Sequence, residues 1–536
     1  MAEASHHDEH QYEIHRIKAP ALQMIIILAG AFMAVLDTSV VNVAIPKLET
    51  DLSASTDQIQ WVLTGYMLVQ GIVVPISGWL TDRFGAKRLF IFSLITFTAG
   101  SALCGMAWNL DSMIFFRILQ AAGGGFMMPV ANAMIFRIFP PDRRGTIMGI
   151  FGITIMAAPA FGPALGGYFV QYASWRLIFY INVPIGIAAS IMAIFLLHDF
   201  SHEAKNKLDT LGFVLSTAGF FSLLFGFSNV SQYGWGSLWV YPYIFLGSAL
   251  LILLIANELL IKNPVIQLRV LGSYMFTMSL VITSVVQVAL FVGIFLLPLY
   301  LQNIMGFTAL RTGLFLTPAA LASAVMMPIS GKLFDKIGAR PLGLVGLAIV
   351  TLSTYGFSKM GLNTSNAVIQ TLYITRSMGM SMVMMPIMTA GMNTLPIQLV
   401  SQASAMSNTI RMVAASLGTA VLTSYMTTRA KIHSFHLADK IAPNTPQGLQ
   451  LHNLQGALGA AGIPPYADHT TALMTLYGWV QKYSFVQGMD DTFMIATILT
   501  TIALLLTLFY ASAKEREIRA KRAQSKGKSS AAVAAE

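Results

Sequence analysis

Apolar residues along this chain gather into long continuous runs separated by short polar stretches. Fourteen runs reach the length that a helix needs to cross a bilayer, about 20 residues. The predicted spans lie near residues 22–45, 57–80, 88–107, 111–138, 146–171, 176–198, 209–230, 239–261, 273–301, 309–334, 341–358, 365–393, 403–427 and 491–511. They group as six, two and six. A membrane β-barrel would instead alternate apolar and polar residues over short strands, so the pattern predicts an all-α polytopic membrane protein.

Composition agrees with this class, because 55% of the 536 residues are hydrophobic and only 10% are charged. The net charge of +10 is typical either of a nucleic-acid partner or of basic loops on the cytoplasmic side of a membrane protein. An even number of spans places both termini on one side, and the loops of that side carry most Lys and Arg residues. We therefore expect both termini to be cytoplasmic and expect no nucleic-acid partner.

Few residues suit metal or catalytic chemistry. Cys104 is the single cysteine, which excludes an intramolecular disulfide. His6, His7 and His10 could bind a metal, but an exposed tail explains them more simply. The sequence contains no P-loop, no HExxH and no G-x-S-x-G motif. We expect no metal, no cofactor, no enzymatic activity and no direct use of ATP.

The spans predict two six-helix halves that flank an inserted pair of helices. The corresponding parts are a cytoplasmic tail 1–21, a first half 22–198, an inserted segment 199–272, a second half 273–511 and a basic cytoplasmic tail 512–536. The second half contains one long external loop, 428–490. Within it, residues 470–488 are apolar enough to lie on the membrane surface as an amphipathic helix. If they crossed the membrane instead, the basic C-terminus would lie outside, against the charge distribution.

An internal repeat supports two related halves. GWLTDRFGAKR at 78–88 recurs as GKLFDKIGAR at 331–340, and both copies close a span and open a basic turn. A generic helix-ending turn explains either copy alone, whereas a repeat at matching positions is typical of transporters with a substrate site between two halves. The expected gating residues are Gly78, Asp82, Arg83, Gly85, Arg88, Asp335 and Gly338.

Asp37 is a carboxylate deep inside the first span, in LDTSVVNVAIP. An ionisable group inside a membrane is costly, so it marks a functional hypothesis. The alternative is a permanent pair with a buried arginine that fixes helix packing. Arg117, in RILQAAG of the fourth span, is its candidate partner, and Gln120 stands one turn away on the same face. Arg117 could also be a packing or snorkelling residue. Arg376 occupies a comparable place in the second half.

The fifth span carries small residues at helical spacing: Gly149, Gly162, Pro163, Gly166 and Gly167. Glycines four residues apart let another helix approach closely, and a proline bends the span. Such a seam suits helices that rock against one another, although small-residue packing without transport remains an alternative.

Together with WRLIFYINVPIG at 175–186, these motifs resemble those of the major facilitator superfamily, and in particular the fourteen-span drug:proton antiporters of the EmrB and QacA type. The resemblance covers nearly the whole chain. It implies that the repeat gates the cytoplasmic side, that Arg117 takes part in proton coupling and that the glycine-rich span is the antiporter motif. Ala86, Ala121 and Ala158 depart from the usual family residues.

The resemblance predicts a proton-coupled multidrug efflux antiporter that exports small amphipathic substrates through the bilayer of the cytoplasmic membrane. Burial disfavours the charged form of Asp37 and a nearby arginine favours it, so helix movement can load and release a proton. Candidate cavity residues, each of which could instead bond between helices, are Gln70, Asn132, Gln287, Tyr300 and Asn408. The alternative cargo is one endogenous lipid or metabolite. A periplasmic adaptor is compatible with the external loop.

Overall fold

The computed structural model describes residues 19–199, 209–261, 264–439 and 465–510. Within these ranges the chain is helical and contains no strand. Each of the fourteen predicted segments coincides with a helix, the sixth being divided at Ile181 between α8 and α9. Eleven described helices are long and apolar enough to cross a membrane. The histidines of the N-terminal tail, the basic residues beyond 510 and the middle of the predicted external loop lie outside the described residues.

The first half packs its helices into one bundle. Its elements are α2 (Pro20–Asp51), α3 (Thr56–Ile59), α4 (Trp61–Phe84), α5 (Ala86–Gly105), α6 (Leu110–Ile138), α7 (Arg144–Tyr172), α8 (Leu177–Tyr180) and α9 (Asn182–Leu196). A large apolar cluster from α2, α5 and α6 forms much of its core. Local signals set the boundaries: Asn109 and Ser112 form a reciprocal capping box at the start of α6.

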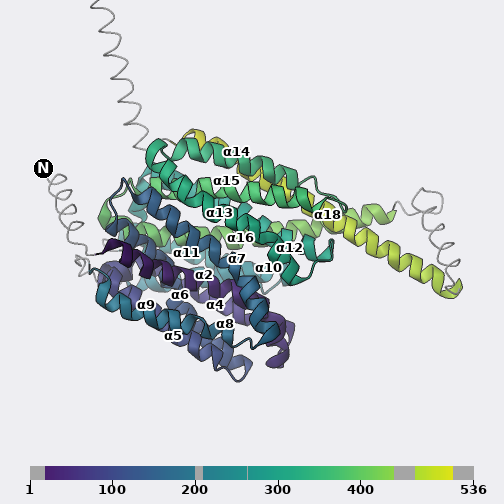
Figure 1. Cartoon of the computed structure of the whole chain (residues 1–536), viewed down its shortest axis with the longest axis horizontal. Helices are drawn as coiled ribbons and strands as arrows, with labels where there is room; N and C mark the ends of the chain where they lie inside the picture. Colours follow the sequence, from purple (N-terminus) through teal and green to yellow (C-terminus); the bar gives the residue numbers. More distant parts are fainter. Residues whose placement is uncertain (1–18, 200–208, 262–263, 440–464, 511–536) are drawn as a thin grey trace, which may run out of the picture.

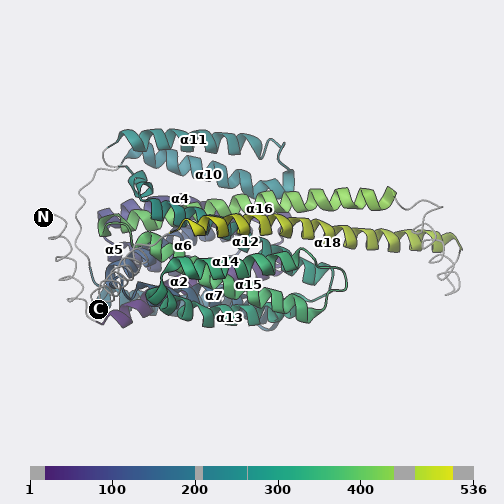
Figure 2. The ribbon, with the colours of Figure 1, turned by 90° about the horizontal axis from the view of Figure 1, so that it is seen from above.

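The inserted pair lies along one flank of the molecule (Figure 2). It consists of α10 (Thr210–Tyr233) and α11 (Tyr241–Leu260), and α10 packs on α4 and α16. After η1 (Leu268–Gly272), the second half comprises α12 (Tyr274–Asn303), α13 (Ala309–Ile337), α14 (Ala339–Phe357), α15 (Asn366–Met392), η2 (Ile397–Leu399), α16 (Val400–Asp439) and α18 (Pro465–Leu508). The halves meet chiefly where α7 packs on α13 and α4 on α16.

The last two helices are far longer than a span and project together beyond the rest of the bundle (Figures 1 and 2). The 44 residues of α18 cover about 66 Å at 1.5 Å per residue, roughly twice the thickness of a bilayer core. Residues 470–488 do not form a separate helix, because this segment continues the last span without a break, and its position relative to the membrane surface stays a prediction. We call the projecting parts, residues 428–439 and 465–490, the helical hairpin.

The two helices of the hairpin, parts of α16 and α18, pack against each other at its base. Gly488 lies against Met426 and Ala430 so closely that a side chain would not fit. Near the base of the hairpin, Arg429 donates to Asp491 at 2.6 Å. The polar sequence that suggested a loop thus forms a two-helix arm whose stability comes from contacts between distant segments.

We predict that spin labels on this arm will report water rather than lipid. With Cys104→Ser as background, a label at Tyr477→Cys in reconstituted protein should be accessible to an aqueous nickel chelate. Ile498→Cys, on an exposed apolar position of the spanning part of α18, is the control and should favour oxygen, which partitions into lipid. Preferential access of oxygen to the label at 477 would show that this segment contacts lipid, as a helix on the membrane surface does.

Candidate functional site

Asp37 lies in the middle of α2 and is completely buried. Its carboxylate accepts three hydrogen bonds from side chains of two other helices. Arg117 Nη1 of α6 donates to Oδ2 at 2.6 Å, Gln120 Nε2 of α6 donates to Oδ1 at 2.9 Å, and Asn182 Nδ2 of α9 donates to Oδ1 at 3.1 Å. The structure thus brings Asp37 and Arg117 together as the sequence predicted.

Arg117 is held from several sides. Its Nη1 also donates to Gln120 Oε1 at 2.7 Å, and its Nε donates to the Val62 carbonyl of α4 at 3.3 Å. The guanidinium lies 4.2 Å from the centre of the Tyr66 ring, within cation–π range. Because Gln120 lies beside Asp37, the guanidinium of Arg117 has a second side-chain acceptor next to the carboxylate.

Three members of this network were not expected from the sequence: Ser101, Asn182 and Tyr66. Ser101 of α5 accepts from Gln120 Nε2 at 2.6 Å. Asn182 belongs to the WRLIFYINVPIG motif, so that motif contained the signal. Tyr66 is one of several aromatic residues in an apolar span, and nothing in the pattern marks it as a neighbour of a cation.

Among the described residues, the spans of the second half contain no equivalent buried ion pair. Arg376 of α15 is buried, and its guanidinium donates to the Ala289 carbonyl of α12 and to Thr354 Oγ1 of α14. Its fixed contacts are therefore neutral acceptors, whereas Arg117 binds a carboxylate.

The two repeat motifs lie at one end of the bundle, at the α4–α5 and α13–α14 turns; we call this the motif end. Asp82 accepts from Gln402 Nε2 of α16 at 3.0 Å and lies 3.6 Å from Arg137 of α6. Asp335 accepts from the backbone amides of Gly145 and Thr146, at 3.0 and 2.9 Å. Asp335 therefore binds the backbone amides of the first turn of α7, where the helix dipole favours a negative charge. Asp82 contacts the first turn of α16 through the side chain of Gln402.

Repeat glycines make these contacts possible. A side chain at Gly78 would collide with Gln402, and one at Gly331 would collide with Gly145. Gly85 and Gly338 end their helices with φ of 90° and 87°, a conformation that favours glycine. Arg83 and Arg88 are exposed beside the first of these turns.

The glycine-rich motif of α7 faces two partners. Gly149 lies against the Met327 carbonyl of α13, across the boundary between the halves, and a Cβ there would lie 2.6 Å from that oxygen. Gly162 and Gly166 lie against Ser39 and Val40 of α2. No atom crowds Gly167, and the side chain of Pro163 lies outside the described residues.

The five candidate cavity residues are not equivalent. Asn132 of α6 is buried and its Oδ1 has no hydrogen-bond partner. Asn408 of α16 donates to the Ser404 carbonyl and accepts from Arg411. Gln70 and Gln287 are half-buried in α4 and α12. Tyr300 is buried in an apolar cluster and donates to the Gly361 carbonyl at 2.7 Å, so we leave it out of the cavity proposed below.

The helices form two six-helix halves and an inserted pair, and residues of the repeated loop motif form hydrogen bonds across the boundary between the halves. This architecture defines a multi-pass membrane transporter. The family model described as Major Facilitator Superfamily matches residues 27–419, and the chain belongs to this superfamily.

Relatives of known sequence cover nearly the whole chain. The chain is 40% identical to the MFS-type transporter YhcA of Bacillus subtilis, which is described as uncharacterized, over 94% of this chain and 95% of that one. It is 29% identical to the multidrug export protein EmrB of Haemophilus influenzae, with coverage of 90% and 94%. These matches agree with the EmrB and QacA type of the family. The solved structure of the proton:xylose symporter XylE superposes with a TM-score of 0.58 at 11% identity, covering 92% of this chain and 96% of that one, and shows the shared fold.

We predict that Arg117→Gln lowers stability by about 3–5 kcal/mol, because it leaves the Asp37 carboxylate buried without its cation. Thermal unfolding of detergent-purified protein measures the loss. The double variant Asp37→Asn with Arg117→Gln should recover part of it, since neither charge then remains. Arg143→Gln, the same change at a side chain that is 77% exposed, is the control. An unchanged melting temperature for Arg117→Gln would contradict a stabilising pair.

We also predict that Asp335→Ala loosens the motif end, because it removes three hydrogen bonds to Gly145 and Thr146. The reporter is the reaction of Ser330→Cys, a buried position next to Gly331, with a maleimide in the Cys104→Ser background. Its rate should rise several-fold. Asp142→Ala, which removes an exposed carboxylate close by, should leave it unchanged, and equal rates in both variants would exclude the lock.

Proposed function

We propose that this protein is a proton-coupled multidrug exporter that carries amphipathic compounds out across the bacterial cytoplasmic membrane. The observation that carries the proposal is the buried Asp37–Arg117 pair inside the first half, at 2.6 Å. Burying a charge inside a membrane costs free energy, so its presence there points to a function. The printed name of the relative EmrB, a multidrug export protein, supports the cargo class.

In this proposal Asp37 is the proton-binding group. With the motif end closed, the carboxylate is ionised and is bound by three donors. Protonation removes the charge that holds Arg117, and Gln120 Oε1 then keeps the guanidinium bonded. Because Asp37 is completely buried, loading it requires α2 to move relative to α6 and α9, which couples the proton to a conformational change.

The motif end is the cytoplasmic side, because most Lys and Arg residues occur on this side. The helical hairpin is then external. Carboxylate contacts between the halves close the cytoplasmic side, and the substrate cavity opens outward. Breaking the contacts of Asp82 and Asp335 while the external side closes gives the alternate access that export needs.

The energetics are sufficient for uphill export. One proton that moves down a membrane potential of about 100 mV and a gradient of one pH unit releases roughly 2.3 plus 1.4 kcal/mol. At about 1.4 kcal/mol per tenfold, this sustains a gradient of several hundredfold for a neutral substrate.

A dedicated exporter of one endogenous lipid or metabolite would use the same fold and coupling. A growth-inhibition panel of cells with and without the gene distinguishes the two. Protection against several unrelated compounds favours multidrug export, and no protection against any favours a dedicated cargo. The external hairpin is available to a periplasmic adaptor in either case.

We predict that Asp37→Asn abolishes uphill export in energised vesicles, because asparagine cannot bind and release a proton. Energy-independent exchange of substrate should persist, since the side chain keeps its size. Asp111→Asn, at an exposed carboxylate in the first turn of α6, is the matched control. Export by Asp37→Asn at the unmodified rate would reduce the pair to a packing element.

A further inference from the structure

Charges inside the membrane-spanning parts of the described helices are unbalanced. Away from the helix ends they consist of one carboxylate, Asp37, and three cations, Arg117, Arg376 and Arg411. Arg117 is neutralised by Asp37. The other two give the spans of the second half a formal excess of two positive charges.

Arg411 differs from the other two arginines in how it is bonded. Its Nη2 donates to Asn408 Oδ1, three residues back in α16, at 2.7 Å, while its Nε is buried without a hydrogen-bond partner. In the described part of the chain no carboxylate offsets its charge. Arg376, by contrast, is fixed by the Ala289 carbonyl and Thr354. The side chain of Arg411 is also partly accessible rather than fully enclosed.

The position of Arg411 places it between the halves. On the same face of α16, Ser404 donates to the Pro129 carbonyl of α6 in the first half. One position further along the chain from Arg411, Met412 reaches Gly71 of α4. The face that carries Arg411 therefore lies where the second half meets α4 and α6 of the first.

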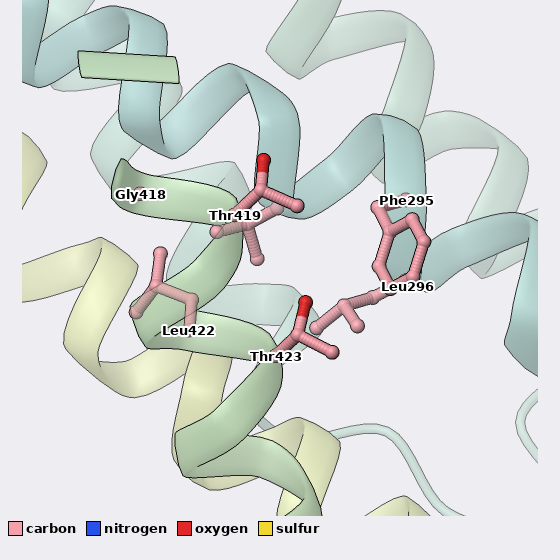
Figure 3. Close-up of a pocket in the computed structure, with 7 residues that line it drawn as sticks. Phe295, Leu296, Gly418, Thr419, Leu422 and Thr423 are labelled. Atoms are coloured by element: carbon pink, nitrogen blue, oxygen red, sulfur yellow. The ribbon is translucent and has the colours of Figure 1, made fainter. Parts of the chain in front are cut away.

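An apolar cleft lies further along the same face. Gly418 and Leu422 follow Arg411 by seven and eleven residues, which is about 10 to 17 Å along the helix. With Thr419 and Thr423 they face Val292, Phe295 and Leu296 of α12 across a small groove that is partly open to solvent. Figure 3 shows Thr419 and Thr423 on one side and Phe295 and Leu296 on the other.

We propose that Arg411 binds the negatively charged group of the substrate and that the α12–α16 cleft receives its apolar part. The inference rests on the proposed export function and narrows its cargo to acidic amphipaths, compounds with a carboxylate, sulfonate or phosphate on an apolar body. The Nε of Arg411 has no hydrogen-bond partner, so the guanidinium can donate to the paired oxygens of such a group. Asn408, already bonded to Arg411, holds the guanidinium in place and is a positioning residue.

Substrate charge also determines how the membrane potential acts. When one proton enters and a monoanion leaves, two positive charges move inward per cycle. When a monocation leaves, no net charge moves. A potential without a pH gradient should therefore drive export of an acidic amphipath and not of a cationic one.

The test uses the full chain and two xanthene dyes of similar size, anionic fluorescein and cationic rhodamine 6G. Fluorescence anisotropy of the purified protein measures binding without any coupling. We expect the unmodified protein to favour fluorescein, Arg411→Gln to weaken its binding at least about tenfold, and Arg411→Lys to retain part of it. Arg143→Gln, which removes one exposed positive charge, should behave as the unmodified protein, and elution as a single species should show that each variant is folded.

Transport in proteoliposomes then separates the two proposals. Fluorescein export driven by a valinomycin–potassium potential and lost in Arg411→Gln supports the inference. Preference for rhodamine 6G, or an unchanged dye preference in Arg411→Gln, overturns the assignment of Arg411 while leaving the export function intact. If neither dye responds to a pH gradient or to a potential although binding follows Arg411, the proton-coupled export function fails and the binding site stands.

Discussion

The hydrogen-bonded pair of Asp37 and Arg117 is the constraint on which the first half depends. Lipid offers no polar partner, so a charge inside a span must be satisfied by other helices. The contacts of this pair and of Gln120 join α2, α4, α5, α6 and α9. Five of the six spans of this half are thereby tied to one buried polar network.

The sixth span, α7, is attached in a different way. Its glycines pack against α2 on one side and against α13 of the second half on the other, and its first turn binds Asp335. The main contact between the halves is thus a flat seam of small residues with a polar anchor at one end. In the proposed mechanism this seam is where the halves rock once the anchor is released, because van der Waals contacts between smooth surfaces are replaced as they slide. The polar network would then hold the first half together while it moves.

The pairing of the repeat motifs extends this arrangement to both sides of the boundary. Asp82 reaches the first turn of α16, and Asp335 reaches the first turn of α7. These two helices occupy corresponding places in the two halves. The lock is therefore nearly symmetric, and opening it breaks both contacts at once.

The sequence was sufficient to predict the helices, because a bilayer requires continuous apolar runs, and to predict the partner of Asp37, because so few groups inside a membrane can neutralise a charge. The resemblance implied that the repeat motif locks the two halves and that a helix start favours the Asp charge. The sequence did not identify Gln402, Gly145 and Thr146 as the partners, since a loop motif does not record what it meets across a boundary. The hairpin was misread for a related reason. Residues 465–490 mix polar and apolar side chains, so their composition does not reveal a helix that continues the last span, and part of this helix packs against α16. For Tyr300, a cavity candidate, nothing in the sequence indicated the nearby Gly361 carbonyl to which its hydroxyl donates.

The two halves differ in the charges that their spans contain. The first half balances its buried cation with Asp37, and in the proposed mechanism this carboxylate is the group that exchanges the proton. The second half has no titrating carboxylate within its described spans away from their ends, and it carries two arginines that keep their charge. One half is thus suited to exchange protons and the other to hold a fixed positive field. In a medium of low dielectric constant, that field favours any negative group that enters between the halves. In the proposed mechanism, the asymmetry that assigns proton exchange to Asp37 therefore assigns selection of the cargo to the second half.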